Sequence, residues 1–425
     1  MTRFSSPSPA LFAFLVSALL SAMPRCAAAA EALVGYHAQV KVAAPTRLDW
    51  VFAVANQSPA EPPAQWLTGY ESTEQKYELF VPENLDKRKP ASVVLFISAG
   101  DGPAGWNQFQ AVCRRAGVIF ASPFGAGNNT PAPRRARIVL DVLDDIARRH
   151  KIDPDRTYLG GFSGGSRIAC GIVFGLPEYF GGVIPVCGAE KLRDESWLRQ
   201  RVTDRISVAL VTGENDFNRA ELERFREPMF AEVGVRVKRW TAPGLGHGVP
   251  DANTLGPVLA WLEEGAVERK RKATQWPAMR IGGAAVPSRT EWADALLKEA
   301  KVRLQKPATT YSGLMQLQGI ATRWSDVSAA REANKILGEY EARAERPWEE
   351  EDIAEQRRFL IAQARSLDGY GSGDLPQQYA AQRKGMLQGA IQLWQQVLDD
   401  RPDSPPGKEA AIRIPKLQAM LEQSQ

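Results

Sequence analysis

The chain has 425 residues, of which 44% are hydrophobic and 24% are charged, and its formal net charge is +4. This length exceeds what one hydrophobic core usually supports, so we expect two domains. The near balance of charge excludes the strongly basic composition of nucleic-acid-binding proteins and gives no reason to expect an acidic polymer as a partner.

The first thirty residues have the pattern of a secretory signal peptide. Arg3 provides a positive charge, residues 10–20 form an apolar core, and Cys26 opens a run of small residues suited to cleavage. Because that core is short for a stable bilayer crossing, we expect a cleaved signal peptide at 1–30 rather than an uncleaved anchor. The protein is therefore expected to be exported, either to the periplasm or out of the cell.

The chain after the signal opens with β-prone runs. Residues 36–42 and 48–54 are predicted to be edge strands that precede a larger sheet.

The most informative stretch is the Gly-x-Ser-x-Gly pattern of residues 161–165, with Ser163 at its centre. A short β-prone segment (156–160) precedes it, and a helix-prone segment (166–174) follows it. Such a pattern between a strand and a helix is typical of the nucleophile elbow, a strained turn that exposes the serine Oγ. Glycine is needed on both sides because the flanking backbones approach too closely for side chains.

Candidates for an acid and a base follow Ser163 in the chain. A buried strand is predicted at 205–212, and Asp216 lies on the loop after it. A second predicted strand at 235–240 leads to His247 in a glycine-rich loop. Serine needs an imidazole to accept its proton, and the imidazole needs a carboxylate that holds its tautomer. The order serine, acid, histidine is that of the α/β-hydrolases.

The choice of histidine is narrow, and the choice of acid is wider. The other two histidines are His37, near the start of the mature chain, and His150, at the end of an arginine-rich helix. Only His247 follows a strand after the candidate acid. Glu214 on the same loop and Glu190 after an earlier strand remain alternatives to aspartate as the acid.

The chain resembles a known family over residues 70–265. The stretch 152–156, followed by a strand and the Gly-x-Ser-x-Gly pattern, looks like the secreted α/β-hydrolases grouped with polyhydroxybutyrate depolymerases and feruloyl esterases. Residues 77–82 and 91–97 are similar to the opening strands of those enzymes. The resemblance implies a mostly parallel sheet with flanking helices and no cofactor.

The resemblance also implies roles for residues. Ser163 would be the nucleophile, Asp216 the acid and His247 the base. The family usually has a His-Gly pair after the strand that ends at residue 97, but this chain has none there. An oxyanion hole needs backbone donors rather than an imidazole, so the N–H groups of Gly164 and Gly100 are expected to form it.

The cysteines give little guidance about function. Cys113, Cys170 and Cys187 remain after signal cleavage, and export would allow one disulfide among them. Their spacing to each other and to histidines does not suggest a metal site.

The chain changes character after residue 265. A charged segment containing glycine and proline (266–287) is predicted to be a linker. Ser288 to Glu291 form a capping-box pattern that starts a helix. Apolar residues then recur at helical spacing, for example over 293–304 and 387–398. Residues 288–425 are therefore predicted to be an all-helical module.

A faint internal repeat runs through the predicted module. Residues 314–333 and 391–410 each predict a helix, a short polar turn and a second helix, which resembles tetratricopeptide-type helical pairs. A partner-binding array and a plain helical appendage both fit. The hydrolase part at 31–265 is long enough to hold a core of its own, so we expect it to fold without the module.

These observations predict an exported serine hydrolase that cleaves carboxylic esters of a small molecule or a polymer through an acyl-enzyme. Two alternatives stay open. One is a serine peptidase, since acyl transfer to water also suits amides. The other is an inactive hydrolase fold that acts with the helical module as a binding scaffold in the cell envelope.

Overall fold

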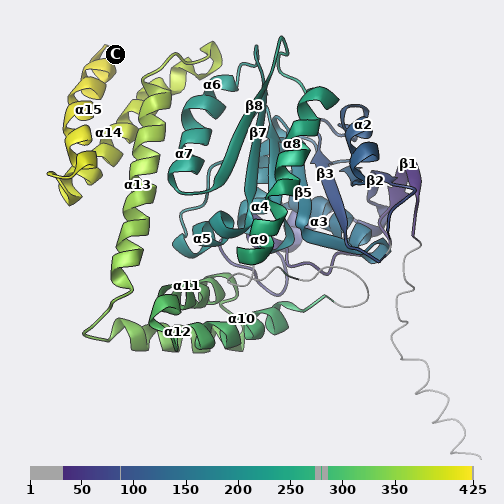
Figure 1. Cartoon of the computed structure of the whole chain (residues 1–425), viewed down its shortest axis with the longest axis horizontal. Coiled ribbons are helices and arrows are strands. Elements are labelled where there is room, and N and C mark those ends of the chain that lie inside the picture. Colours follow the sequence, from purple (N-terminus) through teal and green to yellow (C-terminus); the bar gives the residue numbers. More distant parts are fainter. Residues whose placement is uncertain (1–31, 87, 273–278, 280–285, 424–425) are drawn as a thin grey trace, which may run out of the picture.

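The computed structural model of the protein describes residues 32–86, 88–272, 279 and 286–423 (Figure 1). The predicted signal peptide and much of the predicted linker lie outside the described residues. None of the helices within these ranges combines the length and the hydrophobicity that a bilayer crossing requires.

An eight-stranded sheet forms the centre of the molecule (Figure 1). Its strands lie in the order β1-β2-β4-β3-β5-β6-β7-β8. Strand β2 is antiparallel to both of its neighbours, and the remaining neighbours are parallel. This sheet has the α/β-hydrolase topology, so the predicted fold class is confirmed. The strands are β1 (Gly35–Lys41), β2 (Lys76–Val81), β3 (Ala91–Ile97), β4 (Ile119–Pro123), β5 (Ile152–Phe162), β6 (Gly182–Val186), β7 (Ser207–Gly213) and β8 (Arg236–Ala242).

Helices cover both faces of the sheet and bury it in two layers of apolar side chains. α2 and α8 pack on one face, around Phe96 and Tyr158. α3, α4 and α5 pack on the other face, around Leu95 and Leu159. These helices are α2 (Trp106–Ala116), α3 (Ala132–Arg149), α4 (Gly164–Gly175), α5 (Ser196–Arg205) and α8 (Ala252–Glu264).

Shorter helices occupy the connections. A continuous helical stretch after β7 consists of α6 (Arg219–Glu221), the π-helix η6 (Leu222–Arg226) and α7 (Glu227–Glu232). The 3-10 helices are η2 (Val51–Ala53), η3 (Ala64–Leu67), η4 (Ser72–Glu74), η5 (Pro177–Tyr179) and η7 (Gln377–Gln382).

One predicted edge strand is present and the other is not. Residues 36–42 correspond to β1, but residues 48–54 contain the 3-10 helix η2 instead of a strand. A Cβ added to Gly175 of α4 would lie 3.0 Å from the Cα of Ala53, so this segment packs tightly on a helix. Its apolar residues, such as the fully buried Phe52, serve that contact rather than strand pairing.

The second half of the described chain is helical, as predicted. Glu291 N–H donates to Ser288 Oγ (3.3 Å) and Ser288 N–H donates to Glu291 Oε2 (2.8 Å), which forms the expected capping box. The two repeated segments form the helix pairs α11–α12 and α14–α15, separated by the long α13. The likeness to tetratricopeptide arrays stays a prediction. The helices are α9 (Ala266–Lys272), α10 (Arg289–Arg303), α11 (Pro307–Arg323), α12 (Ser328–Glu341), α13 (Glu349–Gly371), α14 (Arg383–Asp400) and α15 (Pro405–Glu422).

The beginning of the predicted linker is a helix anchored on the sheet. Arg269 of α9 is buried, and its guanidinium donates to the carbonyl of Asp155 (2.7 Å) and to Ser207 Oγ (2.9 Å). Residues 266–272 therefore extend the hydrolase part of the chain rather than connecting it loosely to the next part.

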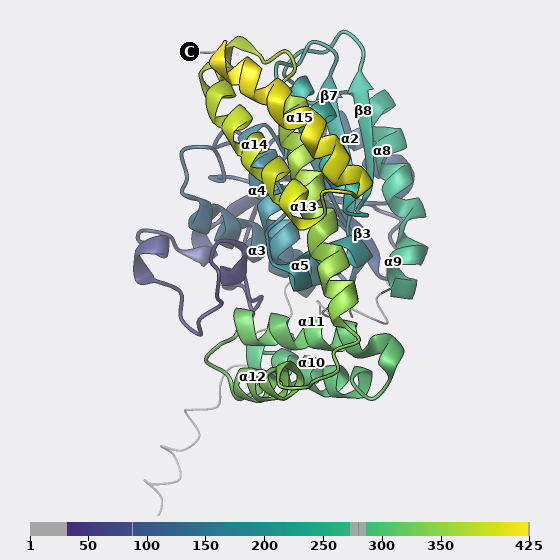
Figure 2. The same ribbon diagram turned by 90° about the vertical axis from the view of Figure 1, so that its left-hand side faces the viewer.

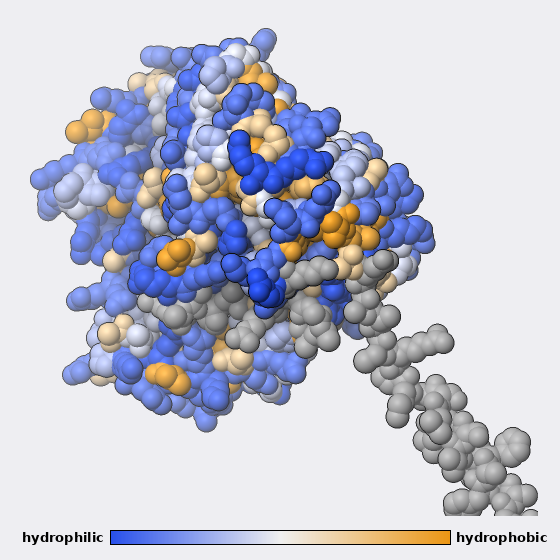
Figure 3. Space-filling view, turned by 45° about the vertical axis from the view of Figure 1, so that its right-hand side comes forward, coloured by the Kyte–Doolittle hydropathy of each residue, from blue (hydrophilic) through white to orange (hydrophobic). Residues whose placement is uncertain are grey.

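The helical half shares a hydrophobic core with the sheet half. A Cβ added to Gly319 of α11 would lie 2.7 Å from the indole of Trp197 on α5, so these two helices are in close contact. Figures 1 and 2 show α10, α11 and α12 at one end of the sheet, and Figure 1 shows α13 running alongside α7. The face seen in Figure 3 is mainly hydrophilic, with small separate apolar patches. That the hydrolase part folds without the helical half stays a prediction, although α11 covers part of α5.

Candidate active site

Ser163 lies at the turn between β5 and α4, where the parallel strands end. Its backbone angles are φ 55° and ψ −117°, a conformation that residues other than glycine rarely adopt. Its N–H donates to the carbonyl of Val186 on the neighbouring strand β6 (2.8 Å), which helps to hold the turn. The residue is half-buried, at the carboxyl end of a central strand of the sheet.

The glycines around Ser163 are required by close backbone approaches. A Cβ added to Gly161 would lie 2.4 Å from the carbonyl oxygen of Gly165. A Cβ added to Gly165 would lie 2.4 Å from the carbonyl oxygen of Ile97. Neither position can hold a side chain. This is the close backbone approach that the Gly-x-Ser-x-Gly pattern predicts.

His247 lies between Ser163 and Asp216. Its Nε2 is 3.0 Å from Ser163 Oγ, and its Nδ1 is 2.8 Å from Asp216 Oδ1. With Nδ1–H donating to the carboxylate, Nε2 is an acceptor that faces the serine hydroxyl. The structure thus brings together the three side chains predicted from the sequence, from the ends of β5, β7 and β8.

Asp216 is buried and accepts further hydrogen bonds besides that from His247. Thr212 Oγ1–H donates to its Oδ2 (2.7 Å), and the backbone N–H of Asn218 donates to its Oδ1 (3.1 Å). These donors stabilise the negative charge of the carboxylate and fix its orientation.

The two alternative acids have other partners. Glu214 accepts the N–H of Gly244 (2.7 Å) at the start of the loop that carries His247. Glu190 accepts the N–H of Lys191 (2.9 Å). Both ring nitrogens of His247 are occupied by Ser163 and Asp216, so the geometry favours Asp216 as the acid.

The remaining histidines lie elsewhere. His37 on β1 has its Nε2 3.0 Å from the carbonyl oxygen of Val34, and His150 is the C-cap of α3, as the sequence predicts.

Two aromatic rings flank the imidazole of His247. Phe217 stacks on it with ring centroids 4.1 Å apart, and Phe162 lies on another side at 4.9 Å. Phe217 is 44% exposed, so part of its ring offers an apolar surface next to the site. Neither phenylalanine was predicted from the sequence, although each lies directly beside Asp216 or Ser163 in the chain.

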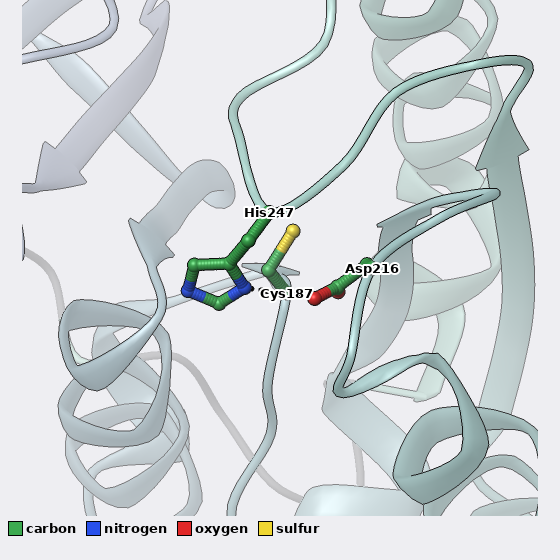
Figure 4. A group of neighbouring side chains, drawn as sticks. All are labelled: Cys187, Asp216 and His247. Atoms are coloured by element: carbon green, nitrogen blue, oxygen red, sulfur yellow. Dashed lines mark hydrogen bonds and ion pairs between the residues drawn. The ribbon is translucent and has the colours of Figure 1, made fainter. Parts of the chain in front are cut away.

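Cys187 is a further neighbour that the sequence analysis did not predict. Figure 4 shows its thiol beside the Asp216–His247 hydrogen bond, and the ligand atoms of the three residues lie within 4.8 Å of one another. Burial, followed by the nearby Asp216, raises the pKa of the Cys187 thiol to about 12. The thiol therefore stays protonated near neutral pH and donates to the carbonyl of Gly248 (3.3 Å).

A metal ion at this cluster would need a thiolate and would compete with the Asp216–His247 hydrogen bond. We therefore interpret the cluster as hydrogen-bonded side chains. That the protein works without a metal or cofactor stays a prediction. Cys113, Cys170 and Cys187 are each buried and unbridged, so the disulfide that export would allow is not formed among them.

The expected oxyanion donors are unequally available. Gly164 is the first residue of α4, directly after Ser163. The N–H of Gly100, however, donates to Ser98 Oγ (3.0 Å) and is therefore occupied by a side chain. The Asn128 side chain lies over Gly164: a Cβ on that glycine would be 2.1 Å from its Oδ1 and 2.9 Å from its Nδ2.

Comparison with known proteins points to esterases. No family model matches the chain. It is similar to the protein named "Putative esterase NocK" from Nocardia uniformis subsp. tsuyamanensis, with 27% identity over 157 residues. The match covers 36% of this chain and 41% of that relative, so the chain spans less than half of the relative's length.

Three solved structures are also similar to this chain, at lower identity. A thermostable esterase is 23% identical, with a TM-score of 0.34 over 46% of this chain and 60% of its own. A ferulic acid esterase is 14% identical, with a TM-score of 0.37 over 47% and 93%. The S-formylglutathione hydrolase FrmB of Staphylococcus aureus is 13% identical, with a TM-score of 0.36 over 45% and 93%. The predicted resemblance to esterases is confirmed, and what this chain does has to be argued from its own residues.

Proposed function

We propose that the protein is a serine hydrolase that cleaves carboxylic esters through an acyl-enzyme. The observation that carries this proposal is the continuous line of hydrogen bonds from Asp216 through His247 to Ser163, with distances of 2.8 and 3.0 Å. The strained backbone of Ser163 supports it, because strain of this kind is concentrated at functional sites.

Acylation follows from the arrangement of these atoms. His247 Nε2 accepts the hydroxyl proton as Ser163 Oγ attacks the ester carbonyl carbon, and the carbonyl oxygen becomes an oxyanion. The buried Asp216 carboxylate stabilises the imidazolium that forms and keeps Nδ1–H pointing toward itself. His247 then gives its proton to the leaving alkoxide oxygen, and the C–O bond of the ester breaks.

Deacylation uses the same groups with water as the nucleophile. His247 Nε2 accepts a proton from water, whose oxygen attacks the acyl carbon. Collapse of the second tetrahedral intermediate returns the proton to Ser163 Oγ and releases the carboxylic acid. The enzyme is restored, and no redox or metal step is needed to balance the reaction.

The oxyanion is proposed to lie against the N–H of Gly164, at the positive end of the α4 dipole. Gly100 can provide the second donor only when its N–H leaves Ser98 Oγ. The Asn128 side-chain amide is the alternative second donor, because it already lies over Gly164. A side-chain amide can serve this role as well as a backbone N–H.

The substrate is proposed to be a small-molecule or polymer ester. The half-buried Ser163 and the exposed ring of Phe217 support an ester whose apolar part rests beside His247. The helical half is the part of the chain available for a protein partner, and we expect no nucleic-acid partner.

Export to the periplasm or the medium is also part of the proposal. It rests on the signal-like pattern of residues 1–30. Mass spectrometry of the protein recovered from the producing cell tests it: a mature N-terminus near residue 31 is expected, and an intact N-terminus on cytoplasmic protein would contradict it.

A substrate panel tests the proposed reaction. Purified protein is assayed on short- and long-chain nitrophenyl esters, feruloyl esters and aminoacyl amides, with Ser163→Ala as the matched control. We expect turnover of at least one ester class that Ser163→Ala lacks. Turnover confined to the amides would make the protein a peptidase, and equal rates for both proteins would contradict the proposal.

A further inference from the structure

Asn218 links the loop of the proposed acid to the helical half of the chain. Its backbone N–H donates to Asp216 Oδ1 (3.1 Å), the same oxygen that accepts from His247. Its side-chain Nδ2–H donates to the carbonyl of Cys187 (2.9 Å). Its side-chain Oδ1 accepts from the hydroxyl of Tyr379 (2.6 Å). Asn218 is only 5% exposed, so these bonds are made away from bulk water.

Tyr379 belongs to η7, in the segment 372–382 that joins α13 to α14. This segment is fastened at both ends. The Arg224 guanidinium on η6 donates to the carbonyl of Asp374, and Arg383 donates to the carbonyl of Gly371 (2.9 Å). The hydroxyl of Tyr379 is therefore held against the loop that carries Asp216 by a segment that is hydrogen-bonded near both of its ends.

Helix α13, which precedes this segment, lies against η6, which follows the loop that carries Asp216. The ring of Tyr370, near the end of α13, stacks on Phe225 of η6 with centroids 5.6 Å apart and planes 4° apart. Figure 1 shows α13 alongside α7, with the end of α13 close to α6. The helical half thus contacts the hydrolase part at the point where the chain leaves Asp216.

We propose that Tyr379 is a positioning residue for the acid of the hydrolase site, supplied by the C-terminal helical half. Its hydroxyl sets the orientation of the Asn218 amide, and Asn218 in turn holds Asp216 against His247. The proposal rests on the proposed function of Ser163, Asp216 and His247, and it gives the helical half a role in turnover besides its role in packing.

The physical reason lies in the two ends of the Asn218 amide. With Tyr379 donating to Oδ1, the Nδ2–H group faces the carbonyl of Cys187, and both bonds are satisfied. Without the hydroxyl, the buried Oδ1 loses its donor, which is costly. A flipped amide would place Oδ1 against the Cys187 carbonyl, which is repulsive. The loop is then expected to shift, and the N–H of Asn218 moves away from Asp216.

Tyr379→Phe removes only the hydroxyl, and Tyr340→Phe is the matched control. Tyr340 lies in the same helical half, and its hydroxyl makes a long bond to the carbonyl of Leu304 (3.4 Å) far along the chain from the site. We expect Tyr379→Phe to lower kcat roughly tenfold with KM changed less than about twofold. Tyr340→Phe should keep the wild-type kcat.

A double-mutant cycle separates positioning from general destabilisation. In the Asp216→Asn background, Tyr379→Phe should change the residual rate by less than about twofold, because its effect acts through Asp216. A full tenfold effect in that background would overturn the proposal. So would a Tyr379→Phe enzyme with wild-type kcat.

Proton NMR provides a readout that does not depend on turnover. The His247 Nδ1 proton, bonded to Asp216, should give a downfield signal that Asp216→Asn abolishes. Tyr379→Phe is expected to shift or broaden this signal, whereas Tyr340→Phe should leave it unchanged. If the wild-type protein hydrolyses no ester, the proposed function fails, and an unchanged signal in Tyr379→Phe would separately overturn the positioning role.

Discussion

Arg323 at the end of α11 forms an ion pair with Glu178 of η5, and both side chains are fully buried. The same guanidinium lies 3.3 Å from Asp49 Oδ2, and Asp49 also accepts from the indole of Trp324 (2.6 Å). The pair joins residues that are 145 positions apart, across the contact between the sheet half and the helical half. Removing the helical half would leave a buried carboxylate without its cation.

Glu178→Gln should therefore destabilise the whole protein. Removing one partner of a buried pair typically costs about 3–5 kcal/mol, and Arg323 would keep only the more distant carboxylate of Asp49. The matched control is Glu332→Gln, which breaks the exposed Lys301–Glu332 pair and should leave the unfolding midpoint close to that of wild type. Urea unfolding of both variants measures the difference, and equal midpoints would contradict the role given to this pair.

The same pair predicts how stability depends on pH. Burial alone would raise the pKa of Glu178, but Arg323 and then Arg201 lower it below its ordinary value of 4.5. A lowered folded-state pKa stabilises the protein above pH 4.5, and this stabilisation is lost as the pH falls from there through the folded-state value. Between pH 6 and pH 3, the midpoint temperature of thermal unfolding should fall more steeply for wild type than for Glu178→Gln. Parallel curves would contradict this.

Asp216→Asn should lower turnover roughly 10⁴-fold while the fold is kept. The amide would no longer hold the Nδ1–H tautomer of His247, so Nε2 could not accept the serine proton. Glu214→Gln and Glu190→Gln should have far smaller effects, because these side chains bond to the N–H groups of Gly244 and Lys191. Ester hydrolysis rates rank the three variants, and a large loss at Glu190 would move the acid to the end of β6.

The second oxyanion donor can be identified by two substitutions. If the Asn128 amide supplies it, Asn128→Ala should lower kcat roughly 10²-fold, and the neighbouring Asn129→Ala should leave it near wild type. If Gly100 supplies it, Ser98→Ala should raise or keep kcat, because it frees the N–H of Gly100. A wild-type rate for Asn128→Ala would exclude the amide.

Short-range features of the chain, such as turns and the ends of strands, explain much of what could be predicted from the sequence. The Gly-x-Ser-x-Gly pattern located the turn around Ser163, because only glycine fits where the Gly161 and Gly165 backbones meet. The carboxyl ends of parallel strands meet at one edge of a sheet, so residues that follow separate strands were expected to lie together. Asp216 and His247 do so.

Long-range packing explains what the sequence did not predict. Nothing local to Tyr379 or Cys187 indicates that they lie near Asp216, because their positions follow from how distant segments pack. Residues 48–54 have a strand-like composition. They pack against α4 and contain a turn of 3-10 helix instead of a strand. The ion pair of Arg323 with Glu178 likewise joins two halves that composition alone suggested were separate.

The most direct test of the account is covalent labelling of Ser163. A fluorophosphonate reacts with a serine only when a neighbouring base activates its hydroxyl. The measurement is intact-protein mass spectrometry, followed by peptide mapping, of wild type, Ser163→Ala and His247→Ala after exposure to the probe. One label is expected on wild type, located on Ser163, and none on either variant. Unchanged labelling of Ser163→Ala would contradict it.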